Sequence, residues 1–195
     1  MFQLNEINLG NVIIESENLT LKEIPFDFRN RFFEIFSNEE VLQYTDKKPT
    51  LNIDEAIVYL QEIHKKSFTK NHIYFGIFNK PDNVLTGIVS LYHIDTKHKF
   101  GSLGILLDKK CWRKGIMSEA LMVFLEFCFN KLEFHRVEAQ TFVNNLPAVK
   151  FFEKLKFTNE GRLRENFLIK GKYEDSFLFS ILKSEFNENQ ILTKP

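Results

Sequence analysis

Apolar and polar residues alternate along much of this chain with a period of two, which is typical of β-strands. Within Val12–Ile24, for example, Leu19 and Leu21 are apolar and the residues next to them are polar. Six further runs have the composition of strands and are bounded by polar or turn residues: His72–Phe78, Val84–Ile94, Phe100–Leu107, Arg136–Phe142, Phe157–Phe167 and Tyr173–Leu182. We therefore expect a sheet of several strands.

In other segments apolar residues recur every three or four positions, which is the period of an amphipathic helix. The clearest example is Ile116–Lys131, where a stripe of apolar residues begins at Met117. Asn52 and Asn145 are suited to be N-caps of two more helices, because an Asn side chain accepts hydrogen bonds from free first-turn amides. Two shorter helices are predicted over Asp27–Ser37 and Asn38–Tyr44.

The helices and strands follow one another without an internal repeat or a linker, so we expect a single α+β domain over residues 1–184. The polar residues 185–195 are expected to form a flexible tail. The chain has 195 residues and 22 Phe, which predicts one core that uses Phe where other proteins use Leu.

Charge and cysteine content exclude several classes of protein. The 26 Lys and Arg balance the 26 Asp and Glu, and a net charge of zero argues against a nucleic-acid binder. No run approaches the roughly 18–20 consecutive apolar residues of a membrane span, and residues 1–10 lack the apolar run of a secretory signal. Because Cys111 and Cys128 do not form a metal-type pair, we expect a reduced, cytoplasmic protein without a metal.

Residues 104–122 are predicted to form a strand, a basic loop and a helix in that order. The loop places Arg113 and Lys114 directly before Gly115, at the expected start of the helix. First-turn amides have no partners within a helix, and the helix dipole favours negative charge there. Glycine also lets backbone amides approach a ligand closely. We interpret this loop as a binding site for a diphosphate, with a solvated basic turn as the alternative.

The loop Trp112–Met117 and the residues Ser118–Leu121 that follow it resemble motif A of the GNAT N-acetyltransferase superfamily. Further segments, in the same order along the chain, resemble the RimJ/RimL-type branch of that superfamily. They are Asn18–Leu21, Gly87–Val89, His135–Ala139, Asn145, Glu153–Leu155 with Phe157, Glu160–Glu165 and Gly171–Asp175. The resemblance covers residues 17–182, and an ordered series is more specific than a single loop.

The resemblance implies a GNAT-like fold, with a mixed, mostly antiparallel sheet that is splayed into a V and flanked by helices. It also implies an acyltransferase whose acetyl donor is acetyl-CoA, with the pantetheine arm between residues 104–107 and 136–142. The acetyl group would pass by direct attack, in a ternary complex, to a primary amine, either a small-molecule amine or a protein N-terminal amine. By the same resemblance the donor is bound by Ile105, Leu106, Leu107, Trp112, Arg113, Lys114, Gly115, Ile116, Met117, Ser118, Asn145 and Phe152. Exposed strand edges would permit a homodimer.

On the catalytic side, three positions depart from the pattern of the family. Phe152 stands where many members have a Tyr that protonates the departing thiolate, Ala148 where many have Ser, and Ser102 where a Glu is common. Because Phe has no proton to donate, protonation of the thiolate needs another donor or water. These departures leave open an alternative function, a non-catalytic acyl-CoA-binding or interaction domain.

Glu138 is the candidate for the catalytic base, because an amine must lose a proton and a carboxylate can take it, directly or through water. Two other roles fit the sequence equally well, a solvent-facing strand residue or an ion-pair partner of Arg136 or Arg162. His135 is a second candidate base, with a structural role as its alternative. Three further polar residues lie at a predicted strand end, where they could face the substrate: Tyr92, His93 and Asp95.

Overall fold

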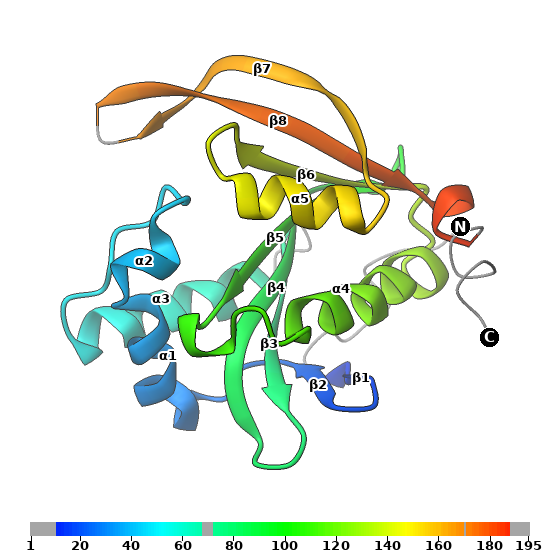
Figure 1. The fold of residues 1–195 in the computed structure, drawn as a ribbon. Coiled ribbons are helices and arrows are strands. Elements are labelled where there is room, and N and C mark those ends of the chain that lie inside the picture. The colour runs from blue at the N-terminus through cyan, green and yellow to red at the C-terminus, as the bar shows by residue number, and fades with distance from the viewer. Residues whose placement is uncertain (1–10, 68–71, 170, 188–195) are drawn as a thin grey trace.

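One sheet runs through the part of the chain that the structure, a computed structural model, describes: residues 11–67, 72–169 and 171–187 (Figure 1). In these residues eight strands lie in the order β1-β2-β3-β4-β5-β6-β8-β7. Their bounds are β1 (Ile14–Glu15), β2 (Leu19–Lys22), β3 (Ile73–Asn79), β4 (Val84–Asp95), β5 (Phe100–Leu107), β6 (Arg136–Phe142), β7 (Thr158–Ile169) and β8 (Lys172–Leu182). All neighbouring strands are antiparallel except β5 and β6, which run parallel.

Helices cover both faces of this sheet (Figure 1). They are α1 (Arg29–Phe36), α2 (Glu39–Leu42), α3 (Ile53–Ser67), α4 (Ile116–Glu126) and α5 (Leu146–Lys154), with short turns η3 (Phe26–Phe28) and η4 (Lys109–Cys111). Helices α4 and α5 pack into one apolar cluster with the sheet, and α1 and α3 pack into another. Among the described residues, no helix combines the length and the apolar character needed to span a bilayer.

The predicted mixed, mostly antiparallel sheet with flanking helices is confirmed, and two element predictions are corrected. The strand predicted over Val12–Ile24 is divided into β1 and β2, because residues 16–18 form a turn in which the Ser16 N–H donates to the Leu19 carbonyl at 3.0 Å. The helix predicted over Ile116–Lys131 keeps α-helical geometry only to Glu126 and then widens into a π-helical turn, η5 (Phe127–Lys131).

The core extends into the segment for which the sequence predicted a flexible tail. Residues 183–187 form a helical turn, and Phe186 is only 2% exposed. Its ring centroid lies 5.2 Å from that of Phe129, and the Lys183 ammonium donates to the Phe129 carbonyl at 2.7 Å. The rest of the expected tail, 188–195, and the first ten residues, where no secretory signal was found, lie outside the described residues.

The parallel pairing of β5 and β6 is short. It runs from Phe100 opposite Arg136 to Leu103 opposite Ala139 and then ends. Beyond that point β5 stays paired with β4 as far as Leu107, while β6 stays paired with β8 to its own end. The two strands therefore diverge, and the V-shaped splay that was predicted between them is confirmed.

Successive residues of a strand point to opposite faces, and the two faces of this sheet differ in chemistry. On the face under α4 and α5, one cross-strand row is fully apolar: Leu91, Leu103, Ala139 and Phe179. One position along on each strand, the row on the other face is polar: Tyr92, Ser102, Glu138 and Ser180. Neither apolar cluster of described residues includes this polar row.

Candidate functional site

The candidate site begins where β5 and β6 separate, after Leu103 and Ala139. Over residues 104–107 the backbone of β5 pairs with β4 on one side and has no partner in β6 on the other. An extended molecule that carries amide groups can hydrogen-bond to such an open edge. Three residues that were predicted to bind the donor lie along this edge and are partly buried: Ile105, Leu106 and Leu107.

The loop after β5 is anchored by Asp108, which is 5% exposed. Its carboxylate accepts the Lys110 N–H at 3.0 Å and forms an ion pair with the guanidinium of Arg31 in α1. Arg31 also donates from Nε to the Leu85 carbonyl at 2.9 Å. Burial opposes ionisation of Asp108, but its hydrogen bonds outweigh burial and lower its pKa. A buried ion pair therefore holds the start of the loop against the sheet.

The middle of the loop folds back over the end of β5. The indole N–H of Trp112 donates to the Leu107 carbonyl at 2.9 Å. Arg113 has a φ of 60° and Gly115 has a φ of 80°, which is the left-handed region that favours glycine. A β-carbon added to Gly115 would meet nothing within 4 Å, so the space around it is open to a ligand.

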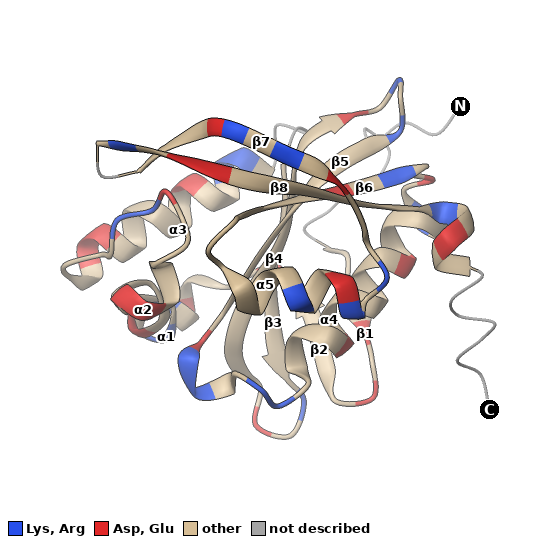
Figure 2. Ribbon diagram, turned by 45° about the horizontal axis from the view of Figure 1, so that its top comes forward, with Lys and Arg blue, Asp and Glu red and all other residues tan. Residues whose placement is uncertain are grey.

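Gly115 is the N-cap residue of α4, and no side chain caps this helix. Ile116, Met117 and Ser118 form its first turn, and basic residues gather in the loop ahead of it (Figure 2). Lys109 is paired with Glu40 at 2.5 Å, whereas Arg113 and Lys114 are next to the uncapped turn in the chain. Free amides, a helix dipole and nearby cations together attract anions.

Glu119, an acid in the same first turn, is satisfied by the turn between β1 and β2. Its Oε1 accepts the Ser16 hydroxyl at 2.6 Å and the Asn18 N–H at 2.9 Å. Burial opposes ionisation of Glu119, but the hydrogen bonds from Ser16 and Asn18 outweigh it and lower its pKa. This carboxylate therefore ties the N-terminal strands to α4.

The other side of the opening ends at Asn145, which follows β6 and caps α5. Its Oδ1 accepts the Ala148 N–H at 3.2 Å, so the predicted N-cap is confirmed. Phe152 is 3% exposed, and its ring centroid lies 5.3 Å from that of Phe157 and 5.4 Å from that of Phe179. The ring of Phe152 therefore belongs to the apolar core, and its contact with the donor stays a prediction.

Glu138 stands in the polar row, opposite Ser102 on one side and Ser180 on the other. Its side chain is 21% exposed, and Oε1 accepts a hydrogen bond from Nε of Arg136 at 2.9 Å. Arg136 also donates to Glu160 at 2.8 Å. Glu138 is thus an ion-pair partner of Arg136, and its strand position still places it on the polar face next to the opening.

Tyr92 lies in the same row, one strand beyond Ser102. A β-carbon built on Gly104 would lie 3.3 Å from Cε1 of Tyr92 and 3.7 Å from Cδ1, so the ring leans over Gly104. Gly104 is the first residue of β5 past its last pair with β6. Next to Tyr92, His93 has a φ of 51° where the β4–β5 register shifts, and such bulges re-aim neighbouring side chains.

A series of tyrosines continues from Tyr92 through Tyr74 of β3 to Tyr59 of α3. Burial raises the pKa of all three hydroxyls, and the charge of Asp46 raises each of them further. Tyr74 adds to the shifts at the other two, and Glu138 adds to the shift at Tyr92. Neighbouring tyrosines in this series are therefore close enough to influence one another electrostatically, from α3 to the opening. Their hydroxyls stay protonated at neutral pH.

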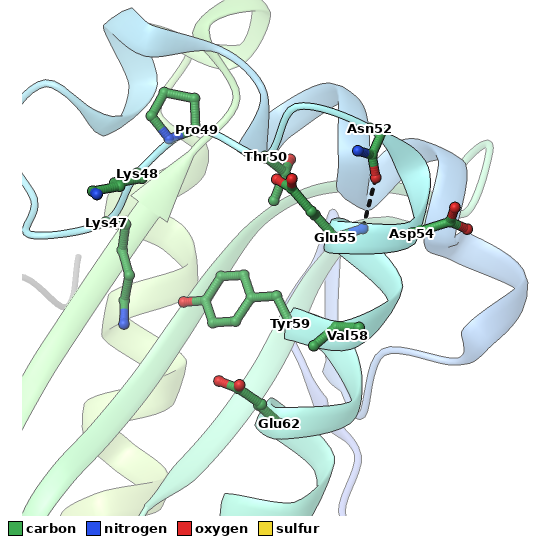
Figure 3. A pocket seen from close by; sticks show the side chains of 10 residues that line it. All are labelled: Lys47, Lys48, Pro49, Thr50, Asn52, Asp54, Glu55, Val58, Tyr59 and Glu62. Atoms are coloured by element: carbon green, nitrogen blue, oxygen red, sulfur yellow. Dashed lines mark hydrogen bonds between the residues drawn. The ribbon is translucent and has the colours of Figure 1, made fainter.

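At the α3 end of this series lies an open pocket of about 590 Å³ (Figure 3). Tyr59 reaches from α3 toward Lys47, whose ammonium lies 5.3 Å from the ring centroid, and Glu62 stands one turn further along the helix. The Thr50 hydroxyl, which also lines the pocket, is buried without a hydrogen-bond partner among the described residues. The lining is of mixed charge, because carboxylates from α3 stand beside the ammonium groups of Lys47 and Lys48, and it suits a polar ligand.

Sequence reasoning missed four residues of this site: Arg31, Asp46, Tyr59 and Tyr74. Three of them come from segments whose pattern indicates only amphipathic helices and a loop. Tyr74 stands between the buried residues Ile73 and Phe75 in β3, so the alternation of the strand could have predicted that Tyr74 points to the opposite, polar face. Within the described ranges, no three His, Cys, Asp or Glu side chains gather as metal ligands.

Comparison with known proteins agrees with this geometry. Residues 18–158 match the model of the acetyltransferase (GNAT) domain family. An N-acetyltransferase of Bacillus licheniformis, p20, is 29% identical over 171 residues, which are 88% of this chain and 96% of that protein. A Bacillus subtilis protein named as a probable N-acetyltransferase, YjcK, is 32% identical over 170 residues, which are 87% and 88% of the two chains.

Among solved structures, the spermidine N-acetyltransferase of Vibrio cholerae in complex with CoA and spermine superimposes with a TM-score of 0.76. It is 25% identical, and the match covers 88% of this chain and 99% of that one. The splayed sheet, the glycine loop before α4 and these matches lead to one assignment. The chain belongs to the GNAT acetyltransferase family, and it is an acyltransferase.

Proposed function

We propose that this enzyme transfers an acetyl group from acetyl-CoA to a primary amine by direct attack within a ternary complex. The observation that carries the proposal is the opening after Leu103 and Ala139, which joins an anion-binding loop to a polar face. The amine nitrogen would attack the thioester carbon, the C–S bond would break, and the sulfur would leave with the bonding pair. Such a reaction needs little more than alignment and removal of a proton.

The residues on the donor side fit acetyl-CoA. The uncapped first turn of α4, the open space at Gly115 and the cations Arg113 and Lys114 suit the diphosphate. The unpaired edge of residues 104–107 suits the amide groups of the pantetheine arm. In this arrangement the diphosphate lies at the loop and the thioester lies near Gly104.

Glu138 is the proton acceptor in this proposal. A carboxylate on the polar face beside the opening can take the proton from an incoming ammonium, directly or through one water. Its ion pair with Arg136 holds the Glu138 carboxylate in place beside the opening.

The acceptor approaches over the polar face from the pocket at Tyr59. The carboxylates of Asp46 and Glu62 favour a partner that arrives as an ammonium ion, either a small-molecule amine or the N-terminal amine of a protein. The Vibrio cholerae relative bound to spermine supports testing polyamines among the first candidates.

Location and assembly are also part of the proposal. Both cysteines are free, which supports a reducing, cytoplasmic location. The resemblance to the RimJ/RimL-type branch supports protein N-termini as candidate acceptors, and the homodimer stays a prediction.

The test combines donor binding with turnover. Thermal unfolding is measured with and without acetyl-CoA, and release of free thiol is then followed with a panel of polyamines, amino sugars and short peptides with free N-termini. We expect a rise in Tm with acetyl-CoA and thiol release with at least one amine. Stabilisation without thiol release from any amine would instead support a non-catalytic acyl-CoA-binding domain. The absence of both effects would contradict the donor assignment.

A further inference from the structure

The leaving sulfur needs a hydrogen-bond donor that the helix α5 does not supply. The side chain of Phe152 has no proton to donate, and its ring is buried in the core between α5 and β8. Ala148, one turn earlier on α5, is equally unable to donate from its side chain. A donor supplied by the protein, rather than by water, must therefore come from another element that borders the opening.

Tyr92 of β4 borders the opening between β5 and β6. The ring is oriented by its distances to a β-carbon built on Gly104, which are 3.3 Å from Cε1 and 3.7 Å from Cδ1. Because Cε1 is the ring carbon nearer the hydroxyl, the hydroxyl end of the ring leans toward Gly104. Tyr92 is paired with Ser102, which comes two residues before Gly104. A ring that leans toward Gly104 therefore extends along the sheet toward the point where β5 and β6 separate.

The surroundings of Tyr92 keep this orientation. Gly104 leaves room for the ring, since a β-carbon there would lie only 3.3 Å from Cε1 of Tyr92. The imidazole of His93 packs edge to face against the Tyr92 ring, with the two ring centroids 5.0 Å apart, at the bulge where the β4–β5 register shifts. None of the described residues hydrogen-bonds to the Tyr92 hydroxyl, so it is available to a ligand.

We propose that Tyr92 is a catalytic residue whose hydroxyl donates a hydrogen bond to the sulfur of the leaving thiolate. This inference rests on the proposed function. When the C–S bond breaks, its electron pair goes to sulfur, and the resulting thiolate accepts a hydrogen bond from the Tyr92 hydroxyl, which keeps its own proton. The proton of the attacking nitrogen passes to Glu138 or to water, and the thiolate takes its proton from solvent after it leaves the site.

Charge around Tyr92 is consistent with a donor that stays protonated. The groups that act on it are Asp46, Tyr74 and Glu138, and together with burial they raise its pKa above the ordinary value for tyrosine. A free thiol has a pKa of about 8.5. The phenol therefore keeps its proton throughout the range in which the thiol ionises.

The test uses the binding of CoA, whose thiol ionises, and of acetyl-CoA, whose sulfur does not. Dissociation constants of both are measured by calorimetry from pH 6.5 to pH 9.5 for the intact enzyme, Tyr92→Phe and Tyr74→Phe. A hydrogen bond to a charged sulfur should make CoA about tenfold tighter, relative to acetyl-CoA, at the alkaline end. We expect Tyr92→Phe to lose this gain and Tyr74→Phe, one strand farther from the opening, to keep it.

Turnover gives the second readout. With an accepted amine, Tyr92→Phe should lower kcat by about 100-fold and leave the KM for acetyl-CoA within twofold. Thermal unfolding of the variant checks that the fold is kept. The proposal is overturned if Tyr92→Phe retains the alkaline gain in CoA affinity, or if its kcat matches that of the unaltered enzyme. Failure of the unaltered enzyme to bind CoA or release thiol would refute the proposed function itself.

Discussion

The proposed donor side and the proposed acceptor side of this site are built in different ways. The donor side is one continuous segment, residues 104–118, and its important groups are backbone amides, an open strand edge and a left-handed glycine. The acceptor side gathers side chains from β3, β4, β6, α3 and the segment before α3. Its carboxylates and hydroxyls come from residues that lie far apart in the sequence.

This difference explains how one fold can keep a donor and vary its acceptor. Backbone amides depend on chain geometry and tolerate changes of side chain, provided that the glycine is kept. Side chains that converge from separate elements can be exchanged one at a time without disturbing the strand edge. We therefore expect substitutions on the donor side to affect binding of acetyl-CoA and those on the acceptor side to affect turnover and the choice of amine.

The largest effect is expected at Gly115. Gly115→Glu adds left-handed strain of about 1–2 kcal/mol and a negative charge where the diphosphate binds, so affinity for acetyl-CoA should fall by about 10³-fold. Calorimetric titration measures the loss. Gly171→Glu is the matched control, because Gly171 also has a φ of 80° and open space around it, in the turn between β7 and β8. Equal affinity for acetyl-CoA in both variants would contradict the proposal that the diphosphate binds at Gly115.

A smaller effect, confined to turnover, is expected at Glu138. Glu138→Gln removes the proton acceptor, so kcat should fall by about 100-fold while the dissociation constant of acetyl-CoA stays within twofold. Steady-state kinetics with an accepted amine, together with donor titration, make the measurement.

The matched control is Glu160→Gln, which removes the other carboxylate partner of Arg136, keeps every residue of the polar row, and retains an amide oxygen that can accept the Ser180 hydroxyl as Glu160 does. A kcat for Glu138→Gln equal to that of this control would remove Glu138 from the mechanism. It would also weaken the contrast between the two sides, because the acceptor side would then lack its base.

The smallest effect concerns the anchor of the donor loop. Asp108→Asn replaces the buried charge that pairs with Arg31, and it should lower the free energy of unfolding at pH 7 by about 2 kcal/mol. Because the folded-state pKa of Asp108 is lowered, its contribution is present above the unfolded-state pKa and is lost as the pH falls through the folded-state pKa. Denaturant titrations at pH 7 and pH 3 measure both differences.

The difference between the variant and the unaltered protein should therefore be full at pH 7 and smaller at pH 3, below the unfolded-state pKa of about 3.8. A difference that stayed constant across this range would show that the ion pair contributes nothing to stability, and that the loop is held by its backbone alone.

Much of the donor side could be predicted from the sequence. A strand, a basic loop, one glycine and a helix are local features, and β5 and α4 begin at the predicted residues, Phe100 and Ile116. The N-cap role of Asn145 followed from the same local chemistry. The role of Phe152 in binding the donor was implied by the family resemblance and stays a prediction, and the ring itself lies in the core.

The acceptor side could not be predicted in the same way. Asp46 lies in a segment with no regular period, and Tyr59 is one aromatic residue in the amphipathic helix α3. Only the folded chain brings them within range of Tyr92, which the sequence placed merely at a strand end. The ion pair between Glu138 and Arg136 was one of several roles that the sequence left open for Glu138, because it depends on side-chain geometry.

The short ladder between β5 and β6 has a consequence for how this enzyme can change over time. A slip of one position would turn Ala139 outward and bury the Glu138 carboxylate among the apolar side chains under α4 and α5. A shift in register would thus expose apolar side chains to solvent and abolish catalysis at the same time. Selection against misfolding and selection for activity therefore act together on these few paired residues.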